Sequence, residues 1–220
     1  NLRHPGSYSL QEEFTKGGFK EVIDDPYVQK VEDKICEITG SKYAVAVTNG
    51  TVGLHLALLA AEVKPQDEVI TQALTFVATG NAISYTGAKP VFLDVDEVTM
   101  GLSANALKSF LENNTSQKNG FCYNAKSGKR IKACVPMHTF GHPVELDELL
   151  VVCEKWGLVL VEDAAESLGS YYKGRHTGTI GHFGALSFNG NKIITTGGGG
   201  AVLCQTKELG ASVKHITTTA

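Results

Sequence analysis

The chain has 220 residues, of which 42% are hydrophobic and 20% charged, with a formal net charge of −3. This composition suffices for one globular domain with a buried core, and it lacks the basic stripe that nucleic-acid binding requires. No run of about 18 apolar residues is present, so no membrane-spanning helix is expected. The first residues lack a signal-peptide pattern, and the five cysteines form no CxxC pair. We therefore expect a cytoplasmic protein with reduced cysteines.

Strand and helix patterns alternate through the first half of the chain. Helical spacing at residues 27–39 precedes a short strand at 43–48, a polar junction at 49–51 and an apolar helix at 52–61. The alternation continues with a strand at 68–71, a helix at 76–85, a strand at 90–94 and a helix at 104–111. The polar stretch 113–130 is predicted to be a loop insertion.

The second half continues this alternation with shorter elements. A strand is predicted at 131–137, a helix at 145–156, a strand at 158–161, and further strands at 185–188 and 201–204 around a glycine run. Strands with continuous apolar character are typical of a sheet covered by helices on both faces. The sequence therefore predicts an α/β fold with three layers and a mostly parallel sheet. No closing element is predicted before Ala220, and we expect the chain to be incomplete.

Candidate site residues follow the predicted strands, because ligands of open α/β sheets bind beyond the carboxyl ends of the strands. Residues 49–51 and 75–76, His138 and Asp163 stand at such positions. If they converge with segment 187–192, the set contains a helix N-terminus for a phosphate, an aromatic ring, a carboxylate and an amine. These are the groups that bind pyridoxal phosphate: an amine for its aldehyde, a carboxylate for its ring nitrogen and donors for its phosphate.

Each of these residues has a common alternative role. A lysine after a loop is usually a solvated charge, an aspartate that closes a strand is commonly a turn residue, and Phe76 alone is typical of a core. His138 and His142 have a spacing found in metal sites, but Gly141 and Pro143 disfavour a helix there, and no metal is predicted. The prediction of a cofactor site depends on all the groups occurring together.

Six ordered blocks resemble one family across nearly the whole chain. They are residues 47–51 (VTNGT), 74–79 (LTFVAT), 136–141 (PMHTFG), 162–167 (EDAAES), 184–188 (GALSF) and 191–200 (NKIITTGGGG). These blocks resemble the DegT-type nucleotide-sugar aminotransferases, which are fold type I enzymes that use pyridoxal 5'-phosphate. The resemblance implies that residues 1–220 are the cofactor-binding large domain, without the smaller C-terminal domain of the family.

The resemblance also assigns roles to individual residues. Lys192 is implied to bind the cofactor covalently, and Asp163 to pair with its pyridinium nitrogen. The remaining implied cofactor contacts are Gly50, Thr51, Val52 and Ser187 at the phosphate, Phe76 stacked on the ring, and Glu166 where many members have histidine or glutamine. Apart from these assignments, His138 and Asn191 are candidate substrate contacts.

Residues 81–85 and 137–143 look most like the LegC-like branch of this family. That branch implies transfer of an amino group from L-glutamate to C4 of a UDP-linked 4-keto-6-deoxy sugar for surface glycans such as lipopolysaccharide. Family members are homodimers with shared active sites. The alternatives are a 3-aminotransferase or a sugar dehydratase of the same family, and a non-catalytic regulatory homologue. A nicotinamide-binding domain that uses glycines 197–200 is a further alternative, although no GxGxxG follows the first strand.

Overall fold

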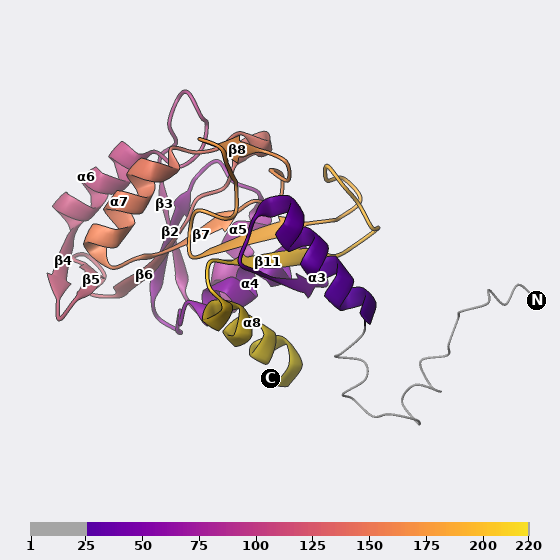
Figure 1. Ribbon diagram of the computed structural model, residues 1–220. Helices are drawn as coiled ribbons and strands as arrows, with labels where there is room; N and C mark the ends of the chain where they lie inside the picture. Colours follow the sequence, from indigo (N-terminus) through magenta and orange to yellow (C-terminus); the bar gives the residue numbers. More distant parts are fainter. Residues whose placement is uncertain (1–25, 220) are drawn as a thin grey trace, which may run out of the picture.

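The computed structural model describes residues 26–219 and shows a mixed β-sheet with helices on both faces (Figure 1). The helices are α3 (Pro26–Thr39), α4 (Gly50–Ala60), α5 (Val77–Tyr85), α6 (Ala104–Asn114), α7 (Leu146–Trp156) and α8 (Lys207–Thr219). The strands are β1 (Tyr43–Val47), β2 (Glu68–Gln72), β3 (Lys89–Leu93), β4 (Thr115–Lys118), β5 (Phe121–Asn124), β6 (Arg130–Val135), β7 (Val159–Asp163), β8 (Tyr171–Tyr172), β9 (Arg175–His176), β10 (Phe183–Ser187) and β11 (Gly200–Cys204). The N-terminal segment, for which no signal peptide is predicted, lies outside the described residues.

The main sheet has the strand order β1-β11-β10-β7-β6-β2-β3. The pairs from β10 through β7, β6 and β2 to β3 are parallel, whereas β11 is antiparallel to both of its neighbours. The prediction of a mostly parallel α/β sheet is therefore confirmed. The reversed direction of β11 places the connection between β10 and β11 at the carboxyl edge of the parallel strands.

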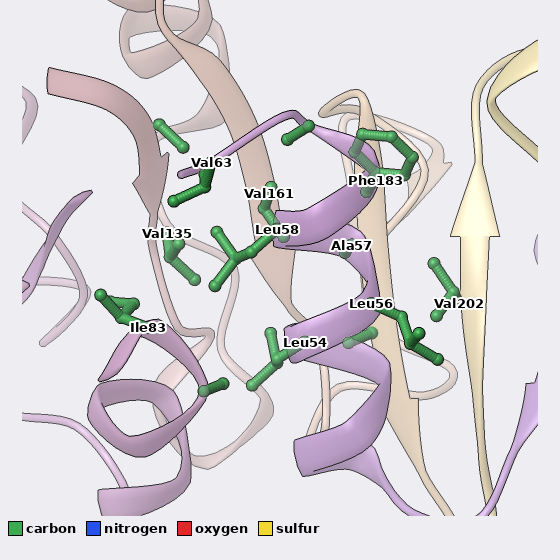
Figure 2. Close-up of a cluster of buried hydrophobic side chains, with 14 of the residues drawn as sticks. Leu54, Leu56, Ala57, Leu58, Val63, Ile83, Val135, Val161, Phe183 and Val202 are labelled. Carbon is green, nitrogen blue, oxygen red and sulfur yellow. The ribbon is translucent and has the colours of Figure 1, made fainter. Parts of the chain in front are cut away.

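Side chains on the two faces of the sheet pack against different helices, because successive residues of a strand point to opposite faces. Val135 and Val161 pack on one face with Leu54 and Leu58 of α4, and Figure 2 shows these side chains together. On the other face, Leu160 packs with core residues of α6 and α7, while Ile35 of α3 packs over β1, β10 and β11. The three-layer prediction is confirmed.

The apolar composition of helix α4 and its N-terminal cap explain how it packs against the sheet. It is apolar on most sides, and Leu54, Leu56 and Leu58 are almost fully buried. Its first turn is capped by Asn49, whose side-chain oxygen accepts from the backbone N–H of Val52 at 2.9 Å. The helix therefore begins at the carboxyl edge of the sheet with its N-terminus fixed.

Two predictions about local structure are wrong. The polar stretch 113–130 is not a loop, because β4 and β5 form a hairpin in which Cys122 pairs with Ile131 at the edge of β6. Residues 207–219, where no element was predicted, form helix α8, which packs Val213 into the core beside α4. Gly210, which disfavours a helix by propensity, lies where α8 contacts Tyr43 too closely for a side chain.

The five cysteines are free, and all except Cys36 are buried. Burial raises the pKa of the Cys204 thiol to about 12, which agrees with a reduced, structural role. Within residues 26–219, no helix is long and apolar enough to span a membrane.

Candidate active site

A pocket with a cavity volume of about 290 Å³ lies at the carboxyl ends of β7 and β10, beside the N-terminus of α4. Its lining includes eight of the predicted site residues: Gly50, Thr51, Phe76, Asp163, Glu166, Ser187, Asn191 and Lys192. A larger hollow of about 480 Å³ lies between α6 and α7 and contains none of them. We refer to the first cavity as the site pocket.

Lys192 reaches the site pocket because its loop leaves and re-enters the sheet at the same edge. Ser187 ends β10 and pairs with Gly200, the first residue of the antiparallel strand β11. Residues 188–199 therefore form a hairpin connection, which we call the lysine loop. Its turn is closed by the backbone N–H of Lys192, which donates to the Asn189 carbonyl oxygen at 3.0 Å. Glycines 197–200 belong to this hairpin and open no helix, which argues against the nicotinamide alternative.

The N-terminus of α4 provides backbone donors on one side of the site pocket. The N–H groups of Gly50 and Thr51 lie in the first turn, where a helix has no internal acceptor for them. A Cβ atom added to Gly50 would lie 2.9 Å from Ser187 Cβ, so only glycine permits this close approach of α4 to β10. The result is a cradle of two N–H groups and the Ser187 hydroxyl, a combination that suits a phosphate.

Asp163 supplies a buried carboxylate to the same pocket. The residue is 2% exposed. Its Oδ2 accepts from the Thr79 hydroxyl at 2.6 Å and its Oδ1 from the Ala165 N–H at 3.2 Å. Burial raises the pKa of Asp163 above its ordinary value, and the hydrogen bond from Thr79 opposes this effect. A positively charged group placed against this carboxylate would remove much of the cost of its burial.

Lys192 is held by two contacts within the described residues. Its Nζ lies 3.1 Å from Glu166 Oε1 and 5.5 Å from the centroid of the Phe76 ring. Phe76 occupies the N-cap position of α5, lines the site pocket and is 57% exposed, so its ring belongs to the pocket rather than to the core. The amine, the carboxylate and the aromatic ring that the sequence predicts at one site do lie together.

Two predicted site residues do not line the pocket. Val52 follows Thr51 in α4, but its backbone N–H is already engaged by Asn49. His138 is fully buried, with its Nε2 2.9 Å from Glu162 Oε2, while its Nδ1 accepts from the Val144 N–H at 3.3 Å. Nε2 therefore carries the proton and donates a hydrogen bond to Glu162. The structure thus directs the His138 side chain toward Glu162, away from any substrate in the site pocket.

Glu162 is the centre of a buried hydrogen-bond cluster behind the site pocket. Its two oxygens accept from the backbone N–H groups of Gly178, Ile180 and Gly181 at 2.7, 2.7 and 2.6 Å, in addition to His138. Burial alone would raise the pKa of Glu162, but these hydrogen bonds outweigh it and the net pKa is lowered. Glu162 therefore remains ionised and ties segment 178–181 to the end of β7.

Thr79 and Met137 are site residues that the sequence reasoning did not single out, and Asn49 was predicted only as part of the junction at 49–51. Thr79 binds Asp163, Met137 lines the pocket and bridges to Asp163 in the sheet, and Asn49 caps α4. Thr79 lies one helical turn after Phe76, at the start of α5. This spacing puts the two residues on the same face of the helix and could have predicted Thr79 as a site residue. The partner of Asp163 could not be read from the sequence, because it lies 84 residues away.

The family model described as "DegT/DnrJ/EryC1/StrS aminotransferase family" matches residues 12–219. The chain belongs to this family. The match covers nearly all of the chain and includes every candidate site residue. It confirms the family resemblance, while the LegC-like branch stays a prediction.

Three relatives show how similar the chain is to known members. It is 43% identical over 178 residues to EpsN of Bacillus subtilis, whose naming as a pyridoxal phosphate-dependent aminotransferase is provisional, and 41% identical over 183 residues to GDP-perosamine synthase of Escherichia coli O157:H7. These matches cover 81% and 83% of the chain but only 43% and 46% of the relatives. The solved structure of DesI with its TDP-sugar product is 32% identical, with a TM-score of 0.74, over 86% of this chain and 44% of DesI. The chain therefore spans less than half the length of these relatives.

Proposed function

We propose that this chain is the cofactor-binding part of a pyridoxal-phosphate-dependent aminotransferase that acts on a nucleotide-linked keto sugar. The observation that carries the proposal is the placement of the Lys192 amine and the buried Asp163 carboxylate in one pocket with the N-terminus of α4. Membership of an aminotransferase family supports the reaction class. The similarity to GDP-perosamine synthase and to DesI, whose solved structure holds its TDP-sugar product, supports a nucleotide sugar as substrate.

The residues of the site pocket fit pyridoxal phosphate. The cradle of Gly50, Thr51 and Ser187 offers donors to a phosphate in a space that a Cβ at position 50 would fill. Asp163 is buried, and its carboxylate has no cationic partner within hydrogen-bond distance among the described residues, so a pyridinium N–H suits it. Phe76 offers an exposed ring at the mouth for stacking. Lys192 supplies the amine that an aldehyde requires.

Each residue has a distinct role in the proposed reaction. When bound, pyridoxal phosphate serves as an electron sink that stabilises negative charge on the substrate carbon. Asp163 would hold the ring nitrogen and, when ionised, would favour its protonated form. Lys192 Nζ accepts a proton from the amino donor and returns a proton when the sugar is aminated, so a single amine acts as base and as acid. Phe76 shields the cofactor side of the pocket from water.

Finer features of the proposal come from the resemblance to the LegC-like branch. We infer L-glutamate as amino donor and C4 of a UDP-linked 4-keto-6-deoxy sugar as acceptor, in the synthesis of surface polysaccharide such as lipopolysaccharide. The two relatives are named for a GDP-linked and a TDP-linked sugar. The choice of UDP therefore depends on residues 81–85 and 137–143 alone. We further propose that residues 1–220 form the large domain of a cytoplasmic homodimer, with Asn191 at the sugar side of the pocket.

Absorbance spectra of the full-length protein with pyridoxal phosphate test this function. The wild type should show a band of lysine-bound cofactor that glutamate converts to that of the aminated cofactor. Lys192→Ala should lack the lysine-dependent band. Lys173→Ala is the matched control, because Lys173 lies at the surface in an exposed ion pair with Asp147. A wild-type protein without a lysine-dependent band would leave the regulatory homologue as the better interpretation.

A further inference from the structure

The site pocket contains three ionisable side chains among its described lining: Asp163, Glu166 and Lys192. They are unequally exposed to solvent. Asp163 is 2% exposed as a residue, while the side chains of Lys192 and Glu166 are 10% and 28% exposed. Glu166 is therefore the carboxylate of the pocket that has contact with water.

Glu166 is also the residue to which Lys192 is hydrogen-bonded. The Nζ–Oε1 distance is 3.1 Å, and no other hydrogen bond from Nζ exists among residues 26–219. The Phe76 ring lies 5.5 Å from Nζ and offers no atom that can take a proton. Asp163 is engaged by Thr79 and Ala165 and is closed to solvent. A proton that leaves Nζ thus has Glu166 as its nearest acceptor.

We propose that Glu166 is a catalytic residue that exchanges protons between the Lys192 amine and solvent, an inference that rests on the proposed function. In the outward direction, an N–H bond of the Lys192 ammonium breaks and an O–H bond forms at Glu166 Oε1. The carboxylic acid then gives this proton to water, and the lone pair of the neutral amine becomes free to attack an aldehyde. In the inward direction, the same two steps run backwards and reload Nζ with a proton. No electron transfer and no further reactant is required.

The position of Glu166 on the backbone supports this role. It lies three residues after Asp163, in the turn that follows β7, and this turn is anchored by the Ala165 N–H on Asp163. Gly141, from the turn after β6, packs closely against the Glu166 carbonyl, where a Cβ would lie 2.6 Å away. The backbone of Glu166 is therefore held on both sides, while its side chain extends toward the lysine loop.

Substitution of Glu166 in the full-length protein, with two readouts, tests the proposal. The first readout is the rate at which the cofactor-free protein binds pyridoxal phosphate, followed by absorbance. The second is the rate at which formaldehyde with cyanoborohydride methylates Lys192, followed by mass spectrometry, and it requires no cofactor. Glu166→Gln keeps the size and an acceptor oxygen but cannot take a proton. We expect it to slow both rates about 100-fold, the lower end of the range for a lost proton-transfer group, and we expect acetate to restore part of each rate.

The controls separate proton exchange from positioning. Glu166→Asp keeps a carboxylate and should retain more of the rate than Glu166→Gln. Glu112→Gln is the matched control, because Glu112 forms an exposed pair with Lys155 at 3.4 Å, and it should leave both rates unchanged. Rates for Glu166→Gln within two-fold of the wild type or above it, or a slow rate that acetate does not restore, would overturn the proposal. A wild type that never forms the lysine-bound cofactor, but whose methylation depends on Glu166 and acetate, would refute the proposed function and not the proton exchange.

Discussion

Replacing Thr79 with valine removes the hydroxyl that donates to Asp163 Oδ2 at 2.6 Å. Both side chains are buried, so water cannot take the place of the lost donor. A hydrogen bond to a charged group contributes about 1.5–3 kcal/mol, and the added methyl group returns up to about 0.8 kcal/mol. We therefore expect Thr79→Val to lower the free energy of unfolding by about 1–2 kcal/mol at neutral pH.

The pH dependence of this loss identifies its cause. Thr79 holds the pKa of Asp163 down against the effect of burial, so the variant raises that pKa further. The hydroxyl stabilises the ionised carboxylate more than the neutral acid, and the loss is therefore largest at a pH above the pKa of Asp163 in the folded protein. As the pH falls and Asp163 is protonated, the loss should shrink by about 1.4 kcal/mol for each unit by which Thr79 lowers the pKa.

Urea unfolding of the cofactor-free protein measures both quantities, at neutral pH and at about pH 4.5, which lies near the ordinary range of carboxyl groups. Asp163→Asn should remove the pH dependence of the Thr79→Val effect, because it has no charge to stabilise. A loss of the same size at every pH would show that Thr79 contributes by packing alone and would refute the reasoning.

Two further substitutions test the cradle and the buried cluster. Gly50→Ala should destabilise the protein by about 1–3 kcal/mol through overpacking against Ser187 and weaken cofactor binding in a fluorescence titration. Gly53→Ala in the same helix is its control, since a Cβ there makes ordinary contacts at 3.5 Å or more; equal losses in both variants would contradict the cradle. Glu162→Gln should cost about 2–6 kcal/mol at neutral pH in urea unfolding, because its amide NH2 cannot accept and leaves two buried donors of the cluster unsatisfied, at about 1–3 kcal/mol each. The pKa of Glu162 is lowered from 4.5, so the stability that its charge contributes is present above pH 4.5 and is lost as the pH falls below that value. The unfolding free energies of wild type and variant should therefore converge in acid. A difference between them that persists in acid would argue against a role of the charge.

The fold was largely predictable from the sequence, because its parallel strands are continuous apolar runs with a helical pattern between them. The hairpin of β4 and β5 was missed because β4 consists of Thr, Ser, Gln and Lys and is mostly exposed, so no apolar alternation marks it. Helix α8 was missed because Gly210 and residues 217–219 are weak helix formers. It forms because Val213 finds a buried position beside α4, which is a tertiary effect.

The candidate site was predictable to the extent that its residues follow strands. Lys192, Asp163 and Gly50 were expected at one edge of the sheet, and the structure places all three there. The exception was His138, which also follows a strand but turns away from the pocket. Its direction depends on Glu162 of the neighbouring strand, whose buried carboxylate accepts a hydrogen bond from His138 Nε2. The two side chains are 24 residues apart in the chain, so no helical or strand periodicity in the sequence indicates their contact.

Glu162 and Asp163 are consecutive residues at the end of β7, and their side chains enter opposite sides of the sheet. One belongs to the hydrogen-bond cluster behind the pocket and the other to the pocket itself. Inserting or deleting a single residue in β7 would interchange these two carboxylates and ruin both environments at once. The length of this strand is thus under two independent constraints, one from the pocket and one from the cluster behind it.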